Sequence, residues 1–168
     1  WGADMDHTTP VEVAAENVVR RSAGIYDAAE SFRIEYRYAN GVRVIMESTE
    51  DKSKWGAKFT GSEGWIFTES EVLQASSDDI LRVKLKSSDK QLFESKNHHR
   101  NFVDAVLSRG PTAAPAEVAQ RAMTACQMGA ISAALGRPLK FDPKAERFEG
   151  DEEANAMLMK PMREAWRI

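Results

Sequence analysis

The sequence lacks the features that mark a membrane protein, a disulfide-linked protein or a general nucleic-acid-binding protein. It has 168 residues and one cysteine, Cys126, so no disulfide can form within the chain. No apolar run approaches the roughly 20 residues that a membrane-spanning helix needs. The formal net charge is −3, and the 23 lysines and arginines are interspersed with 26 acidic residues, whereas a nucleic-acid binder usually carries a dense basic patch. The composition, 42% apolar and 29% charged, is that of an ordinary globular domain.

Motifs that hold phosphates, dinucleotides or a reactive thiol are missing as well. The stretch Gly61-Ser-Glu-Gly64 has neither the Lys-Ser/Thr of a P-loop nor a three-glycine dinucleotide fingerprint, and is interpreted as a turn. Cys126 has no base near it in the sequence, so it is interpreted as a buried packing residue. The acidic run from Asp151 to Glu153 stands where a helix dipole favours negative charge. The sequence therefore predicts no catalytic residue in this chain.

Two of the 3 histidines are adjacent, in the stretch Asn97-His-His-Arg-Asn-Phe-Val-Asp-Ala-Val106. Neighbouring residues on a helix point about 100° apart, so His98 and His99 are poorly placed to hold one metal ion. His7 lies in a loop with two aspartates, and a His/Asp metal site assembled in space, as in a small metal-assisted hydrolase, stays as an alternative. The favoured interpretation has one of the adjacent histidines packing beneath a sheet and the other facing a cleft or a partner.

The strongest local signal is a pair of alternating runs, F32-R-I-E-Y-R-Y38 and V42-R-V-I-M46, on either side of Ala39-Asn40-Gly41. A two-residue Asn-Gly turn would mix polar and apolar residues on both faces. A three-residue loop with Gly41 in the left-handed region instead pairs Tyr36 with Val44 and Ile34 with Met46, and places the large apolar groups on one face. The other face then carries Ile45 among the charged residues Arg33, Glu35, Arg37, Arg43 and Glu47.

The remaining pattern predicts strands first and helices second. Strands are expected at 10–15, 57–61 and 64–68, with a weaker edge strand at 81–85. Asn97 is the predicted N-cap of a helix that ends at Gly110-Pro111, and its apolar stripe consists of Phe102, Val103, Val106 and Leu107.

A second helix is predicted from Pro115 to Gly136. Its stripe of small residues, which includes Cys126 and Gly129, implies close packing on another surface. After Pro138 the chain is expected to be irregular apart from a short capped helix at 151–159. The fold class is therefore α+β, with a mainly antiparallel open-faced β-sheet and helices packed on one face.

The order of these landmarks resembles the C-terminal domain of the Gfo/Idh/MocA oxidoreductases, the glucose–fructose oxidoreductase and inositol dehydrogenase family, in the branch of NADH-dependent dehydrogenases. The resemblance covers nearly the whole chain. Its segments are Tyr36-Arg-Tyr-Ala-Asn-Gly-Val-Arg-Val, Gly61-Ser-Glu-Gly-Trp-Ile, Asn97-His-His-Arg-Asn-Phe-Val-Asp-Ala-Val, Ala114-Pro-Ala-Glu-Val-Ala-Gln-Arg, Leu135-Gly-Arg-Pro-Leu and Ala154-Asn-Ala-Met-Leu with Arg163-Glu-Ala-Trp. Each segment alone is weakly specific, and their order and spacing together are more specific.

This resemblance implies that residues 1–168 form a single domain, the substrate and oligomerisation domain of a longer two-domain protein. The family's N-terminal Rossmann domain, which holds NAD(P), a Lys-Pro motif and a catalytic His/Asp segment, is absent from this sequence. We therefore expect no cofactor in this chain and no complete catalysis by it alone. The open alternative is a non-catalytic protein-interaction module with the same fold. Cytoplasmic location is the default expectation, and export of the longer protein is the alternative.

The resemblance also yields two sets of candidate residues. The helix that begins at Asn97 would aim His98 or Arg100 toward a small-molecule substrate, with Trp1 and Asp6 near the same cleft. The charged face of Arg33, Glu35, Arg37, Arg43 and Glu47 would pair with the same face of another subunit across a two-fold axis. A solvated charged face is the alternative for the second set.

Overall fold

The computed structural model describes residues 5–20, 25, 28–51, 55–89, 91, 93–159 and 162–164. The chain forms two compact units. One consists of Trp1–Met5 and Thr49–Ala116, and the other of Asp6–Ser48 and Glu117–Ile168. The expectation of a single domain over residues 1–168 stays a prediction beside this division, and each unit is described by itself.

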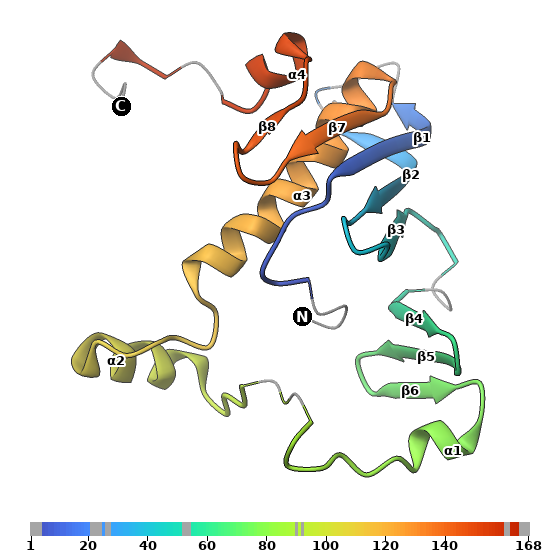
Figure 1. Ribbon diagram of the computed structural model, residues 1–168, viewed down its shortest axis with the longest axis vertical. Helices are drawn as coiled ribbons and strands as arrows, with labels where there is room; N and C mark the ends of the chain where they lie inside the picture. Colours follow the sequence, from blue (N-terminus) through green and yellow to red (C-terminus); the bar gives the residue numbers. More distant parts are fainter. Residues whose placement is uncertain are drawn as a thin grey trace. The chain divides into compact units, whose positions relative to one another are not determined.

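The larger unit is built on a five-stranded sheet with the strand order β3-β2-β1-β7-β8 (Figure 1). Its strands are β1 (Glu12–Arg20), β2 (Ala29–Arg37), β3 (Arg43–Glu47), β7 (Leu139–Asp142) and β8 (Arg147–Phe148). Every neighbouring pair is antiparallel. The predicted antiparallel α+β class is therefore confirmed.

The β2–β3 hairpin has the register that the alternation of its residues predicts. Tyr36 pairs with Val44, and Ile34 pairs with Met46. The Tyr38 amide donates to the Val42 carbonyl at 2.9 Å, and Gly41 has a φ of +89°. This positive φ suits glycine because a Cβ atom would be strained there. The bulged three-residue loop is thus confirmed against the two-residue turn.

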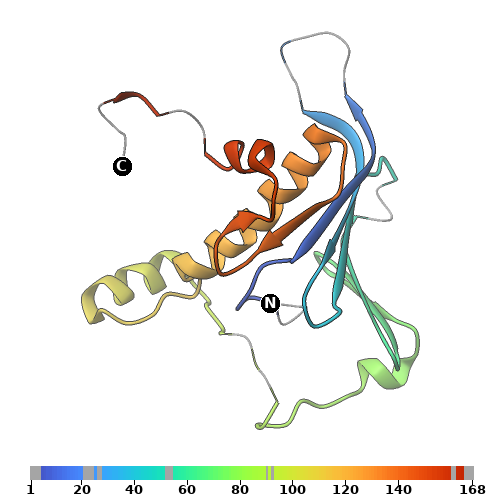
Figure 2. The ribbon, with the colours of Figure 1, turned by 45° about the horizontal axis from the view of Figure 1, so that its top comes forward.

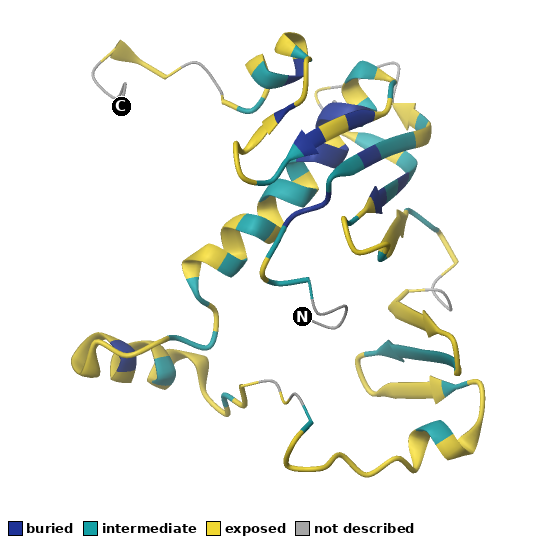
Figure 3. Ribbon diagram, viewed as in Figure 1, coloured by how far each residue is buried: buried dark blue, intermediate teal, exposed yellow. Residues whose placement is uncertain are grey.

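One face of the sheet is covered by α3 (Ala116–Leu135) and by the short α4 (Glu152–Ala156), as Figure 2 shows for α3. Alternate residues of the central strands are buried there, and Figure 3 shows the buried positions gathered where strands and helix meet. The core of this unit is formed by Val13, Ile34, Tyr36, Met128, Ile131, Leu139, Phe141, Phe148 and Ala154.

Gly129 is the point of closest approach between α3 and the sheet. A Cβ atom on Gly129 would overlap the Tyr36 hydroxyl and would lie 3.1 Å from Cδ1 of Ile34. The close packing predicted from the small residues is therefore correct at Gly129, which is buried. It is wrong at Cys126, which is exposed.

The segment after Pro138, which the pattern predicts as irregular, contains two strands. β7 is paired with β1 through Leu139–Val13 and Lys140–Glu12, and β8 is paired with β7. Asn155 of α4 then donates to and accepts from the backbone of Phe148, at 3.0 and 2.8 Å. That side chain satisfies the outer edge of β8 as a further strand would. The predicted short helix is confirmed, with Asp151 as its N-cap.

The smaller unit holds a three-stranded antiparallel sheet of β4 (Ala57–Gly61), β5 (Gly64–Glu69) and β6 (Val72–Ala75), with α1 (Asp78–Leu81) and α2 (His98–Ser108). The strands predicted at 57–61 and 64–68 are confirmed. The edge strand predicted at 81–85 is wrong, because α1 ends at Leu81 and no strand follows it among residues 82–89.

Helix α2 begins where the sequence predicts. The side chain of Asn97 accepts a hydrogen bond from the Arg100 amide at 2.9 Å, so this residue is the N-cap. The predicted apolar stripe is not buried: the exposed fraction of Leu107 is 75%, and Ala105 is the buried residue of the helix. No helix in the described ranges is both long and apolar enough to cross a membrane.

Candidate functional site

The face of the five-stranded sheet opposite α3 carries a cluster of charged side chains, which we call the open face. Strand alternation places there the residues of each strand that lie between the core positions. Cross-strand pairs align Lys140, Glu12, Arg37 and Arg43 in one row and Glu16, Arg33 and Glu47 in another. Between these rows lie Ala14, Glu35 and Ile45.

Glu35 is the centre of the open face. It accepts hydrogen bonds from Arg43 at 2.9 and 3.0 Å and from Arg37 at 3.0 Å, and its side chain is only 13% exposed. The hydrogen bonds from Arg43, followed by the charge of Arg43 and the contact with Arg37, hold the pKa of Glu35 below its usual value, although burial opposes them. Glu35 is therefore ionised at neutral pH.

A second set of ion pairs extends the cluster. Arg33 contacts Glu47 at 2.9 Å and Glu16 at 3.5 Å. The four cations and four anions of the two rows and Glu35 cancel, although the whole chain has a net charge of −3. A face with no net charge has no overall charge repulsion toward a copy of itself, so the pairing of individual charges decides the interaction.

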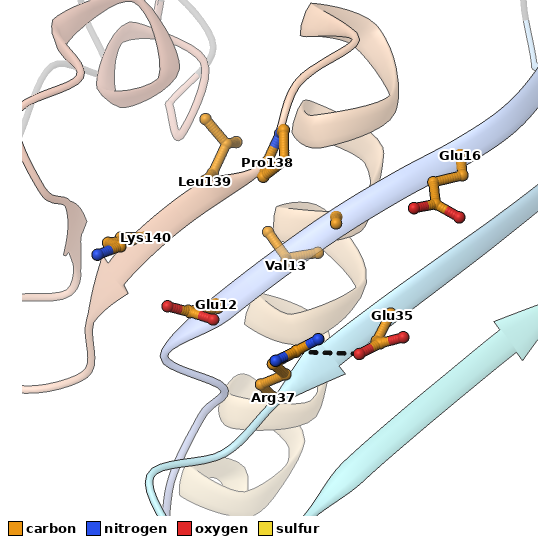
Figure 4. Close-up of a pocket in the computed structure, with 9 residues that line it drawn as sticks. Glu12, Val13, Glu16, Glu35, Arg37, Pro138, Leu139 and Lys140 are labelled. Atoms are coloured by element: carbon orange, nitrogen blue, oxygen red, sulfur yellow. Dashed lines mark hydrogen bonds and ion pairs between the residues drawn. The ribbon is translucent and has the colours of Figure 1, made fainter.

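The open face is hollowed above the small side chain of Ala14. The hollow has a volume of about 410 Å³, and its lining comes from β1, β2 and the start of β7. Figure 4 shows Glu12, Glu16 and Glu35 around it, together with Arg37 and Lys140. Three carboxylates and two cations therefore border a shallow depression of acidic balance.

The five residues predicted as an oligomer interface are thus brought together by the structure, as one ion-paired cluster. Sequence reasoning missed Glu12, Glu16 and Lys140. Their alternation with Val13 and Leu139 gave a signal, but only the pairing of β1 with β2 and β7 places them beside the hairpin.

The candidate substrate residues are placed in different parts of the chain. His98 and Arg100 lie exposed in the first turn of α2, and Arg100 pairs with Asp104 at 2.8 Å. Asp6 belongs to the other compact unit, where its carbonyl accepts a hydrogen bond from Arg121 of α3 at 2.7 Å. Trp1 lies outside the described residues. Arg121, which anchors the segment before β1, was not predicted.

Among the residues that the structure describes, no group of three or more His, Cys, Asp or Glu side chains is arranged to hold a metal ion. A second hollow, of about 620 Å³, lies beside α3 and is lined by Gln120, Gln127, Asn155 and Met159 among others. The Gln127 and Asn155 amides there are bonded to backbone groups of the chain.

The fold and the open face define the class of protein: an α+β domain whose antiparallel sheet has one face under helices and one charged face. The family described as the oxidoreductase family, C-terminal alpha/beta domain, of the Gfo/Idh/MocA group matches residues 3–168. The chain belongs to this family. No curated protein sequence matches it.

Proposed function

We propose that this chain is the substrate-binding and oligomerisation domain of a nicotinamide-dependent oxidoreductase that acts on a sugar or polyol. The observation that carries the proposal is the family match over residues 3–168. In this proposal NAD(P) and the catalytic groups belong to an N-terminal Rossmann domain. This chain would shape the substrate cleft and join the subunits. A reading frame that encodes no Rossmann fingerprint before Trp1 would favour the interaction module instead.

The substrate part of the proposal assigns His98 a contact with the substrate. In the full-length enzyme, we expect His98→Ala to weaken substrate affinity roughly tenfold, the value of one hydrogen bond to a polar ligand. His99→Ala is the matched control, because the neighbouring side chain points about 100° away around the helix. Isothermal titration calorimetry with substrate measures the substrate affinity of both variants. An unchanged affinity in His98→Ala would remove this residue from the cleft.

The oligomerisation part of the proposal assigns the open face to contact with a second copy. We expect the chain to self-associate, and Arg37→Glu to raise the dissociation constant about tenfold or more, because it replaces a cation that donates to Glu35 with an anion in the middle of the face. Association should also weaken as salt increases.

Arg82→Glu is the control for this test. It makes the same charge change at the exposed arginine that caps the C-terminus of α1, whose partners Asp78 and Asp79 are local. Sedimentation velocity over a range of concentrations compares the two variants. A strict monomer at high concentration of the unaltered chain would contradict the interface.

A further inference from the structure

The charges of the open face also favour one alignment of the second copy on the first. This inference rests on the proposed self-association. The central strand β1 presents two acids, Glu12 and Glu16, whereas its neighbour β2 presents two arginines at the same levels. Glu12 pairs in register with Arg37, and Glu16 with Arg33. Two acids of β1 therefore stand beside two arginines of β2, with Ala14 and Glu35 between these two pairs.

We infer that two copies pair across a two-fold axis that runs parallel to the strands, between β1 and β2. This axis places β1 of one copy over β2 of the other and preserves the level along the strands. Glu12 of each copy then faces Arg37 of the second copy, and Glu16 faces Arg33. By symmetry this gives four pairs of opposite charge around the axis.

The other simple two-fold axis crosses the strands at the level of Glu35. It places β1 over β1 and β2 over β2 with their ends exchanged. Glu12 would then face Glu16 of the second copy, and Arg37 would face Arg33. Like charges opposed in a desolvated interface are costly, so the charges disfavour this orientation.

The hollow above Ala14 fits the same orientation. It lies over β1 and is bordered by Glu12, Glu16 and Glu35, and β2 of the second copy presents Arg37 and Arg33 to its two ends, with Glu35 between them at the level of Ala14. Arg37 is 58% exposed and long enough to enter such a depression. A basic side chain in an acid-bordered hollow is favourable.

The outer strands β3 and β7 oppose this orientation only weakly. Arg43 would face Lys140 of the second copy, which is a pair of like charges. The guanidinium of Arg43 is, however, already held by both carboxylate oxygens of Glu35. Packed sheets also twist by about 30° relative to one another, so contacts weaken away from the axis.

Cysteine cross-linking tests the orientation directly. In a Cys126→Ser background, chains carrying Arg43→Cys and chains carrying Lys140→Cys are co-expressed and treated with a short bis-maleimide. The proposed axis places β3 over β7 of the second copy, so we expect covalent dimers that contain one chain of each kind. Chains carrying Ile45→Cys alone should give no covalent dimer above background, because this axis separates the two cysteines by three strand spacings, about 14 Å.

Each outcome decides one of the two proposals. Two results overturn the orientation. One is cross-linking of Ile45→Cys chains with one another, and the other is a dimer in solution whose mixed chains give no covalent product. Either result leaves self-association standing, with another alignment of the open faces or with contact at another surface. A strict monomer of the unaltered chain by sedimentation overturns the proposed self-association itself. Covalent dimers from the mixed chains with none from Ile45→Cys support the orientation.

Discussion

Phe148→Ala is expected to lower the free energy of unfolding by about 3–5 kcal/mol, the largest single effect that we predict. Phe148 is 1% exposed and packs edge-to-face on Phe141 with the ring centroids 5.3 Å apart. Removal of the ring leaves a cavity between β7, β8 and α4, and deprives Phe141 of its aromatic neighbour. Urea denaturation followed by circular dichroism measures the loss.

The control for this prediction is Phe102→Ala, which removes the same atoms from a side chain that is 62% exposed on α2. We expect that variant to lose well under half as much free energy. If the two variants lose equal amounts, Phe148 is not a core residue, and the assignment of β8 to the sheet would be wrong.

Gly129→Ala is expected to lower the free energy of unfolding by about 1–3 kcal/mol. Alanine is the better helix former by about 1 kcal/mol, so helix propensity alone predicts the opposite sign. The added Cβ atom would overlap the Tyr36 hydroxyl, which forces the helix and the sheet apart. Thermal and urea unfolding decide the sign.

Tyr36→Phe provides the matched test of the cause. The Tyr36 hydroxyl is buried and has no hydrogen-bond partner among the residues that the structure describes, and burial raises the pKa of Tyr36 to about 12. Removal of that oxygen should recover a large part of the stability lost in Gly129→Ala. Ala130→Val, at an exposed neighbouring position of α3, should change stability by only a few tenths of a kcal/mol. If the double variant Gly129→Ala/Tyr36→Phe recovers no stability, the predicted overlap between the added Cβ atom and the Tyr36 hydroxyl is contradicted.

The hairpin shows how far local pattern reaches. Its register followed from alternation and one glycine, because a slip by a single residue would have exchanged the apolar and charged faces. The Asn97 and Asp151 caps were equally local, since each side chain bonds an amide three residues on. The charged residues of β2 and β3 could therefore be assigned to one face before any tertiary information.

The strands β7 and β8 show where local pattern fails. They span four and two residues, too short for alternation to be distinguished from chance. β8 is completed by a side chain, that of Asn155, instead of a neighbouring strand. For the apolar stripe of α2, the predicted helical spacing was correct and the predicted burial was wrong. Spacing alone does not supply a surface that covers the stripe.

The sequence by itself determined the antiparallel α+β class, the hairpin register and the five charges of β2 and β3, because each depends on residues close together along the chain. Only the tertiary structure decided that Glu12, Glu16 and Lys140 join those charges and that Ala14 leaves a hollow among them. The burial of Val13, Leu139 and Phe141 under α3 determines which strands, distant in sequence, pair with one another. The charges on the opposite face come together as a consequence of that burial.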